Sequence, residues 1–345
     1  MSFFLTDPSC HYSDVVIVPQ FSEILTRKDV LTSVYDFMGL KKIDVPIMCA
    51  NMDTICEAEM CIAMWKSGGL GALHRFMTIK ENVSQFLEVS EAGCECLVSL
   101  GVNAESLERF EALHAAGARR FIVDIAHGHS VLMRDMMFVM RKRHPNIFIL
   151  AGNVGTPVAV EDLEDWGADA IKVGIAGGAV CSTKNVTGVE TPMFSTVKEC
   201  AVAAKIAIVA DGGIRTYADC AKAIGIGASI VMAGFLFAGC DETPPVVAFN
   251  KAQIDNKTFE SKDSFRKLEK ARQNLIYRGM ASQGAMQRIG KTDRTPEGST
   301  VSVDLKGPAA AIVAGLKGGL QSSFSYSGAR NLPEFQEKVI FRIRG

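Results

Sequence analysis

The stretch that decides the fold is "IFILAGNVGTPVAVEDLEDWGADAIKVGI", from Ile147 to Ile175. It opens with an apolar run, continues into an amphipathic segment, and ends in a second apolar run that follows "GA". Near-continuous apolar runs are typical of parallel strands covered by helices, and the "GA" is consistent with a helix C-cap. The stretch therefore predicts a strand–helix–strand unit with parallel strands at 147–153 and 170–175.

The same pattern recurs along the chain and adds further predicted strands. These lie at 45–50, 69–74, 96–101, 120–126, 206–212 and 229–234. Eight strands that alternate with helices predict a (β/α)8 TIM barrel. A doubly wound open sheet remains the alternative, because periodicity alone does not establish that the sheet closes.

The 345 residues fit one large α/β barrel, so we expect a single catalytic domain over 1–345. The stretch 11–33 precedes the first strand and is expected to cap or flank the barrel bottom. A polar insertion at about 241–306 follows the eighth strand. Insertions after barrel strands lie over the catalytic face, so this one predicts a flap, before an apolar helix in "GPAAAIVAGLKGGL".

The composition of the chain argues against several classes of protein. The chain is 48% hydrophobic and 22% charged, as in a soluble globular protein, and its net charge of −1 gives no attraction to nucleic acid or anionic membranes. No apolar run is long enough to span a bilayer, and the first residues lack the pattern of a secretory signal. Ten cysteines without a C-x-x-C pair argue against a zinc site or disulfide framework and for the cytoplasm.

Glycines follow the sixth, seventh and eighth predicted strands, at Gly177–Gly178, Gly212–Gly213 and Gly234. Successive backbone N–H groups make an anion cradle, and barrels place phosphate sites after strands seven and eight. Each Gly-Gly alone is also consistent with a tight turn. The three loops together favour a phosphorylated small molecule as ligand.

Cys181 lies in "VGIAGGAVCSTK", past the end of the sixth strand. Most cysteines are buried small hydrophobes, but this position and the nearby Lys184 favour a thiolate nucleophile. Thr183 can hold a water or a leaving group. His127 or His129 could approach as a partner base, or both could have packing roles, and the sequence leaves this open.

The motifs "ANMDT", "DIAHGHS", "AGNVGTP", "VGIAGGAVCSTK", "ADGGIR", "MAGFLFAG", "YRGM", "PEGST", "DLKG" and "LQSSFSYSGA" occur in this order. In these motifs the chain resembles the IMP dehydrogenase/GMP reductase family over essentially its whole length. The resemblance implies a homotetrameric barrel whose cysteine attacks C2 of a purine nucleotide.

Two absences favour the reductase branch of that family. The CBS-domain pair usual in the dehydrogenase after the second strand is missing, and the segment "QRIGKTDRT" lacks the dehydrogenase's Arg-Tyr pair. The resemblance then implies NADPH-dependent reductive deamination of GMP to IMP and ammonia. The alternatives are an IMP dehydrogenase without CBS domains, which would turn IMP and NAD into XMP, and a barrel that binds FMN or only senses nucleotides.

The resemblance also implies roles for individual residues. Cys181, Thr183 and Glu297 would be catalytic, although Glu297 by itself is also consistent with a solvated flap charge. Substrate contacts would come from Asn51, Asp211, Gly212, Gly213, Gly234, Phe235, Met280, Ala281, Ser282 and Gly298. Cofactor contacts would come from Asp124, Ile125, Ala126, Asn153, Gly174, Ser322 and Tyr326, the last from a neighbouring subunit. The carbonyls of Ala176, Gly178 and Cys181 would bind a monovalent cation such as K+.

Three positions depart from the family pattern. Ala179 stands where many members place a phosphate-binding serine, Phe235 where a serine or glycine is common, and Glu190 where a glycine is usual.

Overall fold

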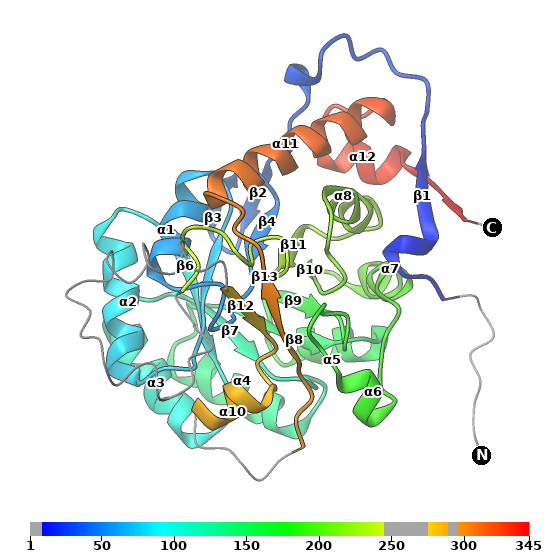
Figure 1. Ribbon diagram of the computed structural model, residues 1–345. Helices are drawn as coiled ribbons and strands as arrows, with labels where there is room; N and C mark the ends of the chain where they lie inside the picture. The colour runs from blue at the N-terminus through cyan, green and yellow to red at the C-terminus, as the bar shows by residue number, and fades with distance from the viewer. Residues whose placement is uncertain (1–8, 245–274, 289–294, 345) are drawn as a thin grey trace, which may run out of the picture.

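Eight parallel strands form the centre of the computed structural model, which describes residues 9–244, 275–288 and 295–344 (Figure 1). The sheet runs in the order β4-β11-β10-β9-β8-β7-β6-β5. Its strands are β4 (Ile47–Cys49), β5 (Gly71–Leu73), β6 (Cys96–Leu100), β7 (Arg120–Asp124), β8 (Phe148–Val154), β9 (Ala170–Val173), β10 (Ala207–Asp211) and β11 (Ile230–Ala233). Every predicted strand is confirmed.

The two ends of this sheet meet. Met48 pairs in parallel with Leu70 just before β5, the Cys49 N–H donates to the Leu70 carbonyl at 2.9 Å, and the Leu70 N–H donates to the Ile47 carbonyl at 2.9 Å. These bonds bring β4 against β5. The fold is therefore a (β/α)8 barrel rather than an open sheet.

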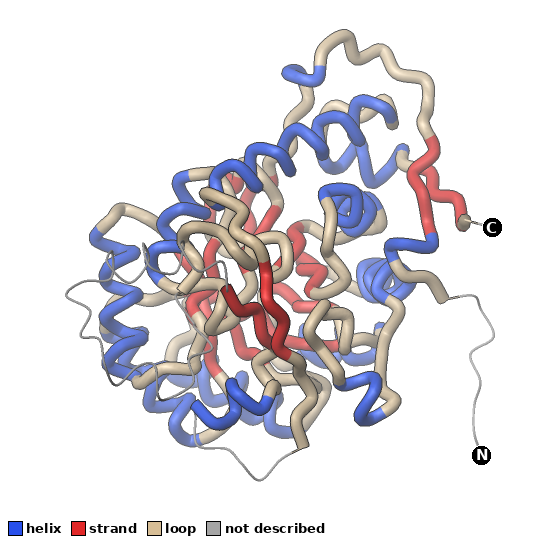
Figure 2. The backbone as a smooth tube through the Cα atoms, in the orientation of Figure 1, coloured by secondary structure: helices blue, strands red, loops and turns tan. Residues whose placement is uncertain are grey.

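Helices surround the strands, as the blue and red tubes of Figure 2 show. They are α1 (Ala58–Lys66), α2 (Ile79–Glu91), α3 (Ala104–Ala115), α4 (Val131–Arg143), α5 (Pro157–Asp165), α6 (Thr183–Thr187), α7 (Met193–Ala203), α8 (Tyr217–Gly225), α10 (Gln283–Arg288), α11 (Ala309–Tyr326) and α12 (Leu332–Lys338). The Thr156 side chain accepts a hydrogen bond from the Ala159 N–H and Pro157 opens α5, which explains why that helix begins there.

A hairpin closes the bottom of the barrel. Strands β2 (Val34–Phe37) and β3 (Leu40–Ile43) pack Phe37 and Leu40 against side chains from the barrel interior, such as Ile122, Leu150 and Val209. The Arg120 Nε, at the start of β7, donates to the Met38 carbonyl at 2.9 Å.

The stretch 11–33 was expected to cap or flank the barrel bottom, and the cap is formed by 34–43. The stretch 11–33 flanks the barrel instead. Its strand β1 (Val15–Val18) pairs antiparallel with β14 (Ile340–Ile343), at the right of Figure 1, and its short helix η2 (Arg27–Asp29) contacts α11.

The described part of the flap is an antiparallel pair of strands, β12 (Leu275–Arg278) and β13 (Thr300–Val303), joined to α10. In Figure 1 the pair lies in front of the barrel strands. The rest of the predicted flap, at 245–274 and 289–294, lies outside the described residues. Within the described ranges, no helix has the length and apolar character needed to cross a membrane.

Candidate functional site

A cavity of about 760 Å³ opens at the carboxyl ends of the barrel strands, under the flap. Most of the predicted site residues line it: Asn51, Asp124, Ile125, Ala126, Asn153, Gly174, Ala176, Gly178, Cys181, Thr183, Asp211, Gly212, Gly213, Gly234, Phe235, Met280, Ala281 and Glu297. Ser282, Gly298, Ser322 and Tyr326 are not among its lining residues. The volume is within the range of pockets that bind small molecules and cofactors.

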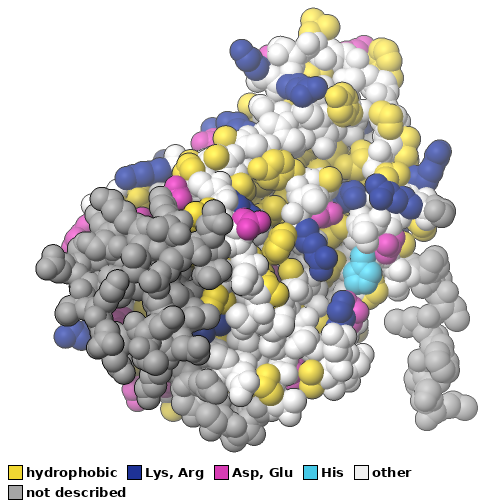
Figure 3. All heavy atoms as spheres, viewed as in Figure 1, with side chains coloured by type: hydrophobic (Ala, Val, Ile, Leu, Met, Phe, Trp, Pro, Cys, Tyr) yellow, Lys and Arg dark blue, Asp and Glu magenta, His cyan; other side chains and the backbone are white. Residues whose placement is uncertain are grey.

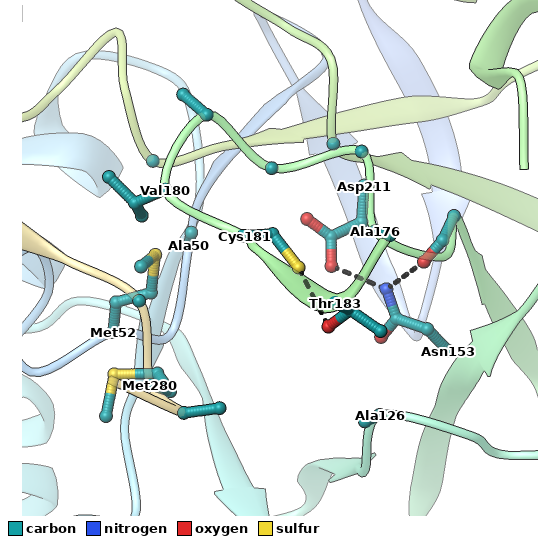
Figure 4. A pocket seen from close by; sticks show the side chains of 18 of the residues that line it. Ala50, Met52, Ala126, Asn153, Ala176, Val180, Cys181, Thr183, Asp211 and Met280 are labelled. Carbon is teal, nitrogen blue, oxygen red and sulfur yellow. Dashed lines mark hydrogen bonds between the residues drawn. The ribbon is translucent and has the colours of Figure 1, made fainter. Parts of the chain in front are cut away.

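Cys181 is the one partly exposed cysteine, since all the others are buried. Its Sγ lies 3.2 Å from the Thr183 Oγ1, and Figure 4 shows both side chains at the edge of the open cavity. The loop before it needs unusual backbone angles, with φ of +140° at Gly174 and +60° at Ala176. A Cβ on Gly174 would lie 2.0 Å from the Asp211 carbonyl oxygen, so only glycine fits there.

The flap is hydrogen-bonded directly to the cysteine loop. The Ser182 N–H donates to the Glu297 carbonyl at 2.9 Å, and the Ser299 N–H donates to the Val180 carbonyl at 2.8 Å. The Glu297 N–H in turn donates to the Ala281 carbonyl at 3.0 Å. Three separate chain segments, 180–182, 297–299 and 279–281, therefore lie edge to edge, and Glu297 enters the cavity wall beside Cys181.

Behind that wall lie Ser282 and Gly298, which pair with each other. The Ser282 side chain is buried, and its Oγ accepts a hydrogen bond from the Ala285 N–H at 3.3 Å. The hydroxyl therefore helps to hold the start of α10, and the contact of Ser282 with a substrate base stays a prediction.

A buried lysine forms the polar base of the cavity. The Lys172 Nζ lies 2.7 Å from the Asp124 Oδ1 and 2.7 Å from the Asp211 Oδ2, with 3% of the lysine side chain exposed. Burial alone would lower the pKa of Lys172, but the two carboxylates raise it above its ordinary value. Burial would likewise raise the pKa of Asp124, and the Lys172 ammonium holds it below its usual range.

Two amide side chains brace these carboxylates. The Asn153 Nδ2 donates to the Asp211 Oδ2 at 2.9 Å and to the Gly174 carbonyl at 2.8 Å, and its Oδ1 accepts from Lys172 (Figure 4). The Asn51 Nδ2 donates to the Asp124 Oδ2 at 3.0 Å. Asn51 and Asn153 therefore orient the carboxylates, and both Asn153 and Lys172 bind the same oxygen of Asp211, its Oδ2.

The glycine loops do not all present free N–H groups. The Gly213 N–H donates to the Gly177 carbonyl at 2.7 Å, so its expected role as a phosphate donor is taken over by a bond within the protein. In contrast, the N–H groups of Phe235 and Leu236 have no hydrogen-bond acceptor among the residues that the structure describes. The Lys306 Nζ holds the carbonyls of these two residues, at 2.6 Å and 3.2 Å.

Three expected partners of the cysteine lie elsewhere. The His129 Nε2 is 2.6 Å from the Asp162 Oδ2, His127 is exposed, and neither histidine is a lining residue of the cavity. The Lys184 ammonium binds the Glu190 Oε1 at 2.7 Å instead of supporting a thiolate. This pair also gives the unusual Glu190 a role, because it joins α6 to the chain that returns from it.

Ser322 and Tyr326 lie on α11, the helix along the top of Figure 1, away from the cavity of their own chain. The Ser322 Oγ donates to the Gly318 carbonyl at 2.9 Å, and the Tyr326 hydroxyl accepts from Arg27 at 3.2 Å. Tyr326 is 56% exposed.

Lys172 and Tyr277 are among the lining residues that sequence reasoning missed. A lone lysine within the apolar run "AIKVGI" was the available signal for the first, because a charge buried in a strand requires a partner. Tyr277 carried no such signal. It is buried, and its hydroxyl would lie 2.8 Å from a Cβ added to Gly234, so it stands beside the loop after β11.

Comparison with known proteins identifies similar chains. A family model described as "IMP dehydrogenase / GMP reductase domain" matches residues 9–344. A GMP reductase of Chromobacterium violaceum is 36% identical over 338 residues, which cover 96% of this chain and 98% of that protein. A GMP reductase of Streptococcus pyogenes serotype M5 is 35% identical over 328 residues, covering 94% of this chain and 92% of that protein.

Proposed function

Because the chain belongs to the IMP dehydrogenase/GMP reductase family, we propose that it is an oxidoreductase that converts GMP to IMP and ammonia by NADPH-dependent reductive deamination. The observation that carries this proposal is the placement of Cys181, Thr183 and Glu297 together at one edge of the cavity.

In the proposed reaction the Cys181 thiolate adds to C2 of the purine, which forms an S–C2 bond and a tetrahedral centre that carries the amine. Thr183 and Glu297 deliver a proton to that amine, the C2–N bond breaks, and ammonia leaves. A carboxyl suits this role because it moves a proton over a short distance. The product of this half-reaction is a thioimidate on Cys181, a covalent intermediate that divides one difficult step into two.

NADPH, when bound, would supply the hydride that C2 needs. The S–C2 bond would then break, so that Cys181 returns to the thiolate and IMP leaves. The wall formed by Asp124, Ile125 and Ala126 would hold the cofactor, with Gly174 beneath it and Asn153 fixing the carboxylates. Two features of the cavity are compatible with a bound cofactor. The cavity extends beside Cys181, and its wall includes Asp124, a hydrogen-bonded carboxylate whose lowered pKa keeps it ionised.

The nucleotide would lie with its ribose on Asp211 and its base against Met280 and Ala281. Its phosphate would take the N–H groups after Gly234, with Gly212 and the Gly177–Gly178 turn forming the wall. The Tyr277 hydroxyl, which lies beside Gly234, would supply the side-chain contact that Ala179 cannot give.

Ser322 and Tyr326 would reach the cofactor of a neighbouring subunit in a homotetramer. Figure 3 shows several hydrophobic side chains on the upper part of the molecule. Before η2, Phe21 is 87% exposed and Leu25 is 98% exposed. Exposed apolar side chains of this extent are usual at subunit interfaces.

A monovalent cation such as K+ would use the carbonyls of Ala176, Gly178 and Cys181. The Gly178 carbonyl already accepts the Cys181 N–H at 3.1 Å, and its second lone pair would serve the ion. All ten cysteines are free thiols, which supports a location in the reducing cytoplasm.

A paired absorbance assay tests the function. NADPH consumption with GMP supports the reductase, whereas NADH formation from IMP and NAD with no reaction on GMP would identify a dehydrogenase. Bound flavin in the purified protein would point to the third alternative. Cys181→Ala must lose turnover, and Glu297→Gln must slow it by roughly 10²–10⁴-fold if the carboxyl acts as the acid.

A further inference from the structure

We propose that Asp53 and Arg278 are positioning residues whose buried ion pair holds the flap so that Glu297 faces Cys181. This inference rests on the proposed function and extends it to residues that do not touch the reacting atoms. Asp53 belongs to the loop after β4, and Arg278 is the last residue of the flap strand β12.

The pair is bidentate and buried. The Arg278 Nε donates to the Asp53 Oδ1 at 3.2 Å while its terminal nitrogen binds the Asp53 Oδ2, and 1% of the aspartate and 12% of the arginine side chain are exposed. A forked guanidinium–carboxylate pair fixes orientation as well as distance. Backbone contacts add to it, since the Asp53 N–H points to the Met280 Sδ at 3.3 Å and the Arg278 N–H to the Thr54 Oγ1 at 3.4 Å.

From this ion pair, a continuous set of hydrogen bonds leads to the nucleophile. The residue after Arg278 is Gly279, whose N–H donates to the Ser299 carbonyl at 3.0 Å. Ser299 and Glu297 are the two residues that bond to the cysteine loop, through Val180 and Ser182. A shift of β12 would therefore move 297–299 relative to 180–182.

The geometry of Gly279 and Gly298 makes this assembly tight. A Cβ on Gly279 would lie 2.9 Å from the Val180 carbonyl oxygen, and one on Gly298 would lie 2.8 Å from the Ser282 nitrogen. The three segments pack backbone to backbone, so the ion pair at Asp53 acts on a rigid unit rather than on a loose loop.

The experiment compares the full-length wild type with Arg278→Gln, Arg278→Lys and the isosteric neutral pair Asp53→Asn/Arg278→Gln. Arg134→Gln is the matched control, because Arg134 forms an exposed pair with Asp135 on the outer helix α4. We expect Arg278→Gln to lower kcat by roughly 10²-fold, as small misplacements of reacting groups do, with a smaller change in KM for GMP. The neutral pair should regain part of the rate, Arg278→Lys should fall between, and Arg134→Gln should match wild type.

A double-mutant cycle distinguishes an effect of Arg278 that acts through Glu297 from an independent loss of activity. If Arg278 acts through Glu297, then Arg278→Gln adds almost no loss to Glu297→Gln, whereas additive losses would overturn the proposal. Wild-type kcat in a folded Arg278→Gln would overturn it as well.

Hydrogen exchange provides a readout that does not depend on turnover. Residues 275–288 and 295–303 should exchange faster in Arg278→Gln than in wild type, and unchanged exchange would refute the proposal. A wild type that does not consume NADPH with GMP would instead refute the proposed function, and the exchange result would still decide the role of the ion pair.

Discussion

Replacement of Lys172 by methionine is the perturbation that tests the base of the cavity most directly. Methionine preserves most of the volume and removes the charge that Asp124 and Asp211 share. We expect a folded but destabilised protein without measurable turnover, because the carboxylate predicted to bind the ribose and the one predicted beside the cofactor lose the same anchor.

The size of the effect follows from the geometry. Two unit charges 2.7 Å apart attract by about 6 kcal/mol at an effective dielectric constant of about 20, and Lys172 makes two such pairs. Desolvation offsets much of this attraction, so the measurable quantity is the cost of leaving charges unpaired, about 3–5 kcal/mol. With an unfolding entropy of roughly 2.1 cal/mol/K per residue over 345 residues, that cost corresponds to a Tm lower by about 4–7 °C.

The pH dependence has a definite sign. In the wild type the pKa of Asp124 is held below its usual range by Lys172, so this carboxylate stabilises the fold above its unfolded pKa and loses that effect as the pH falls through its folded pKa. Without the lysine, burial raises the pKa of Asp124. The free-energy cost of burying the charged carboxylate then disappears as the pH falls and the carboxyl takes up a proton.

Thermal unfolding of wild type and Lys172→Met is therefore measured between pH 8 and pH 5, with Lys142→Met at an exposed position of α4 as the control. The difference in Tm should be largest at pH 8 and narrow toward pH 5. A difference that stays constant over this range, or one no larger than that of the control, would refute the assignment of Lys172 as the shared counter-charge.

Three further substitutions test the loops around the cavity. Lys306→Met removes the ammonium that holds the carbonyls of the loop after β11, so the KM for GMP should rise roughly tenfold while kcat changes little in steady-state kinetics. Ala176→Gly relieves a φ of +60° and should raise the free energy of unfolding in urea by about 1 kcal/mol. Gly174→Ala should abolish the yield of folded protein, since its Cβ would meet a carbonyl oxygen at 2.0 Å, whereas Gly188→Ala, at a φ of +75° with no neighbour within 4 Å, should remain soluble.

The strands could be predicted because a parallel strand buried on both faces leaves a nearly pure apolar run in the sequence. The bottom hairpin at 34–43 left no such signature. Its turn places Asp36 and Met38 at positive φ without the Asn-Gly or Asp-Gly pair that usually announces a hairpin. Its burial depends on Phe37 and Leu40 meeting the barrel interior, which is a tertiary contact that local patterns do not record.

The site, like the fold, could be predicted only in part from the sequence. The position of Cys181 after the sixth strand was predictable, and so was the neighbourhood of Asp211, because strand ends of a barrel meet at one face. The partners were not: Lys184 turns to Glu190, and the Gly213 N–H to Gly177. The sequence indicates which residues reach the catalytic face of the barrel. It does not indicate which of two nearby acceptors a donor will bond to, because that depends on small differences in atomic position.

Cys181 and Glu297, the proposed nucleophile and acid, lie far apart in the sequence, so the flap must be held in place for the two to meet. Cys181 is fixed by a loop of the barrel itself, whereas Glu297 comes from a segment more than a hundred residues later, which is joined to 180–182 and to Ala281 by backbone hydrogen bonds. Hydrogen bonds between backbones set a register but resist sliding weakly, since each contributes only about 1 kcal/mol net. A charged, buried and bidentate contact such as Asp53–Arg278 supplies what the backbone bonds lack, because displacing it separates two buried opposite charges. The chemistry proposed at Cys181 would therefore depend on an ion pair at the end of β4, a strand separated from β9 by β10 and β11. A flap that is folded but detached should then bind nucleotide without releasing ammonia.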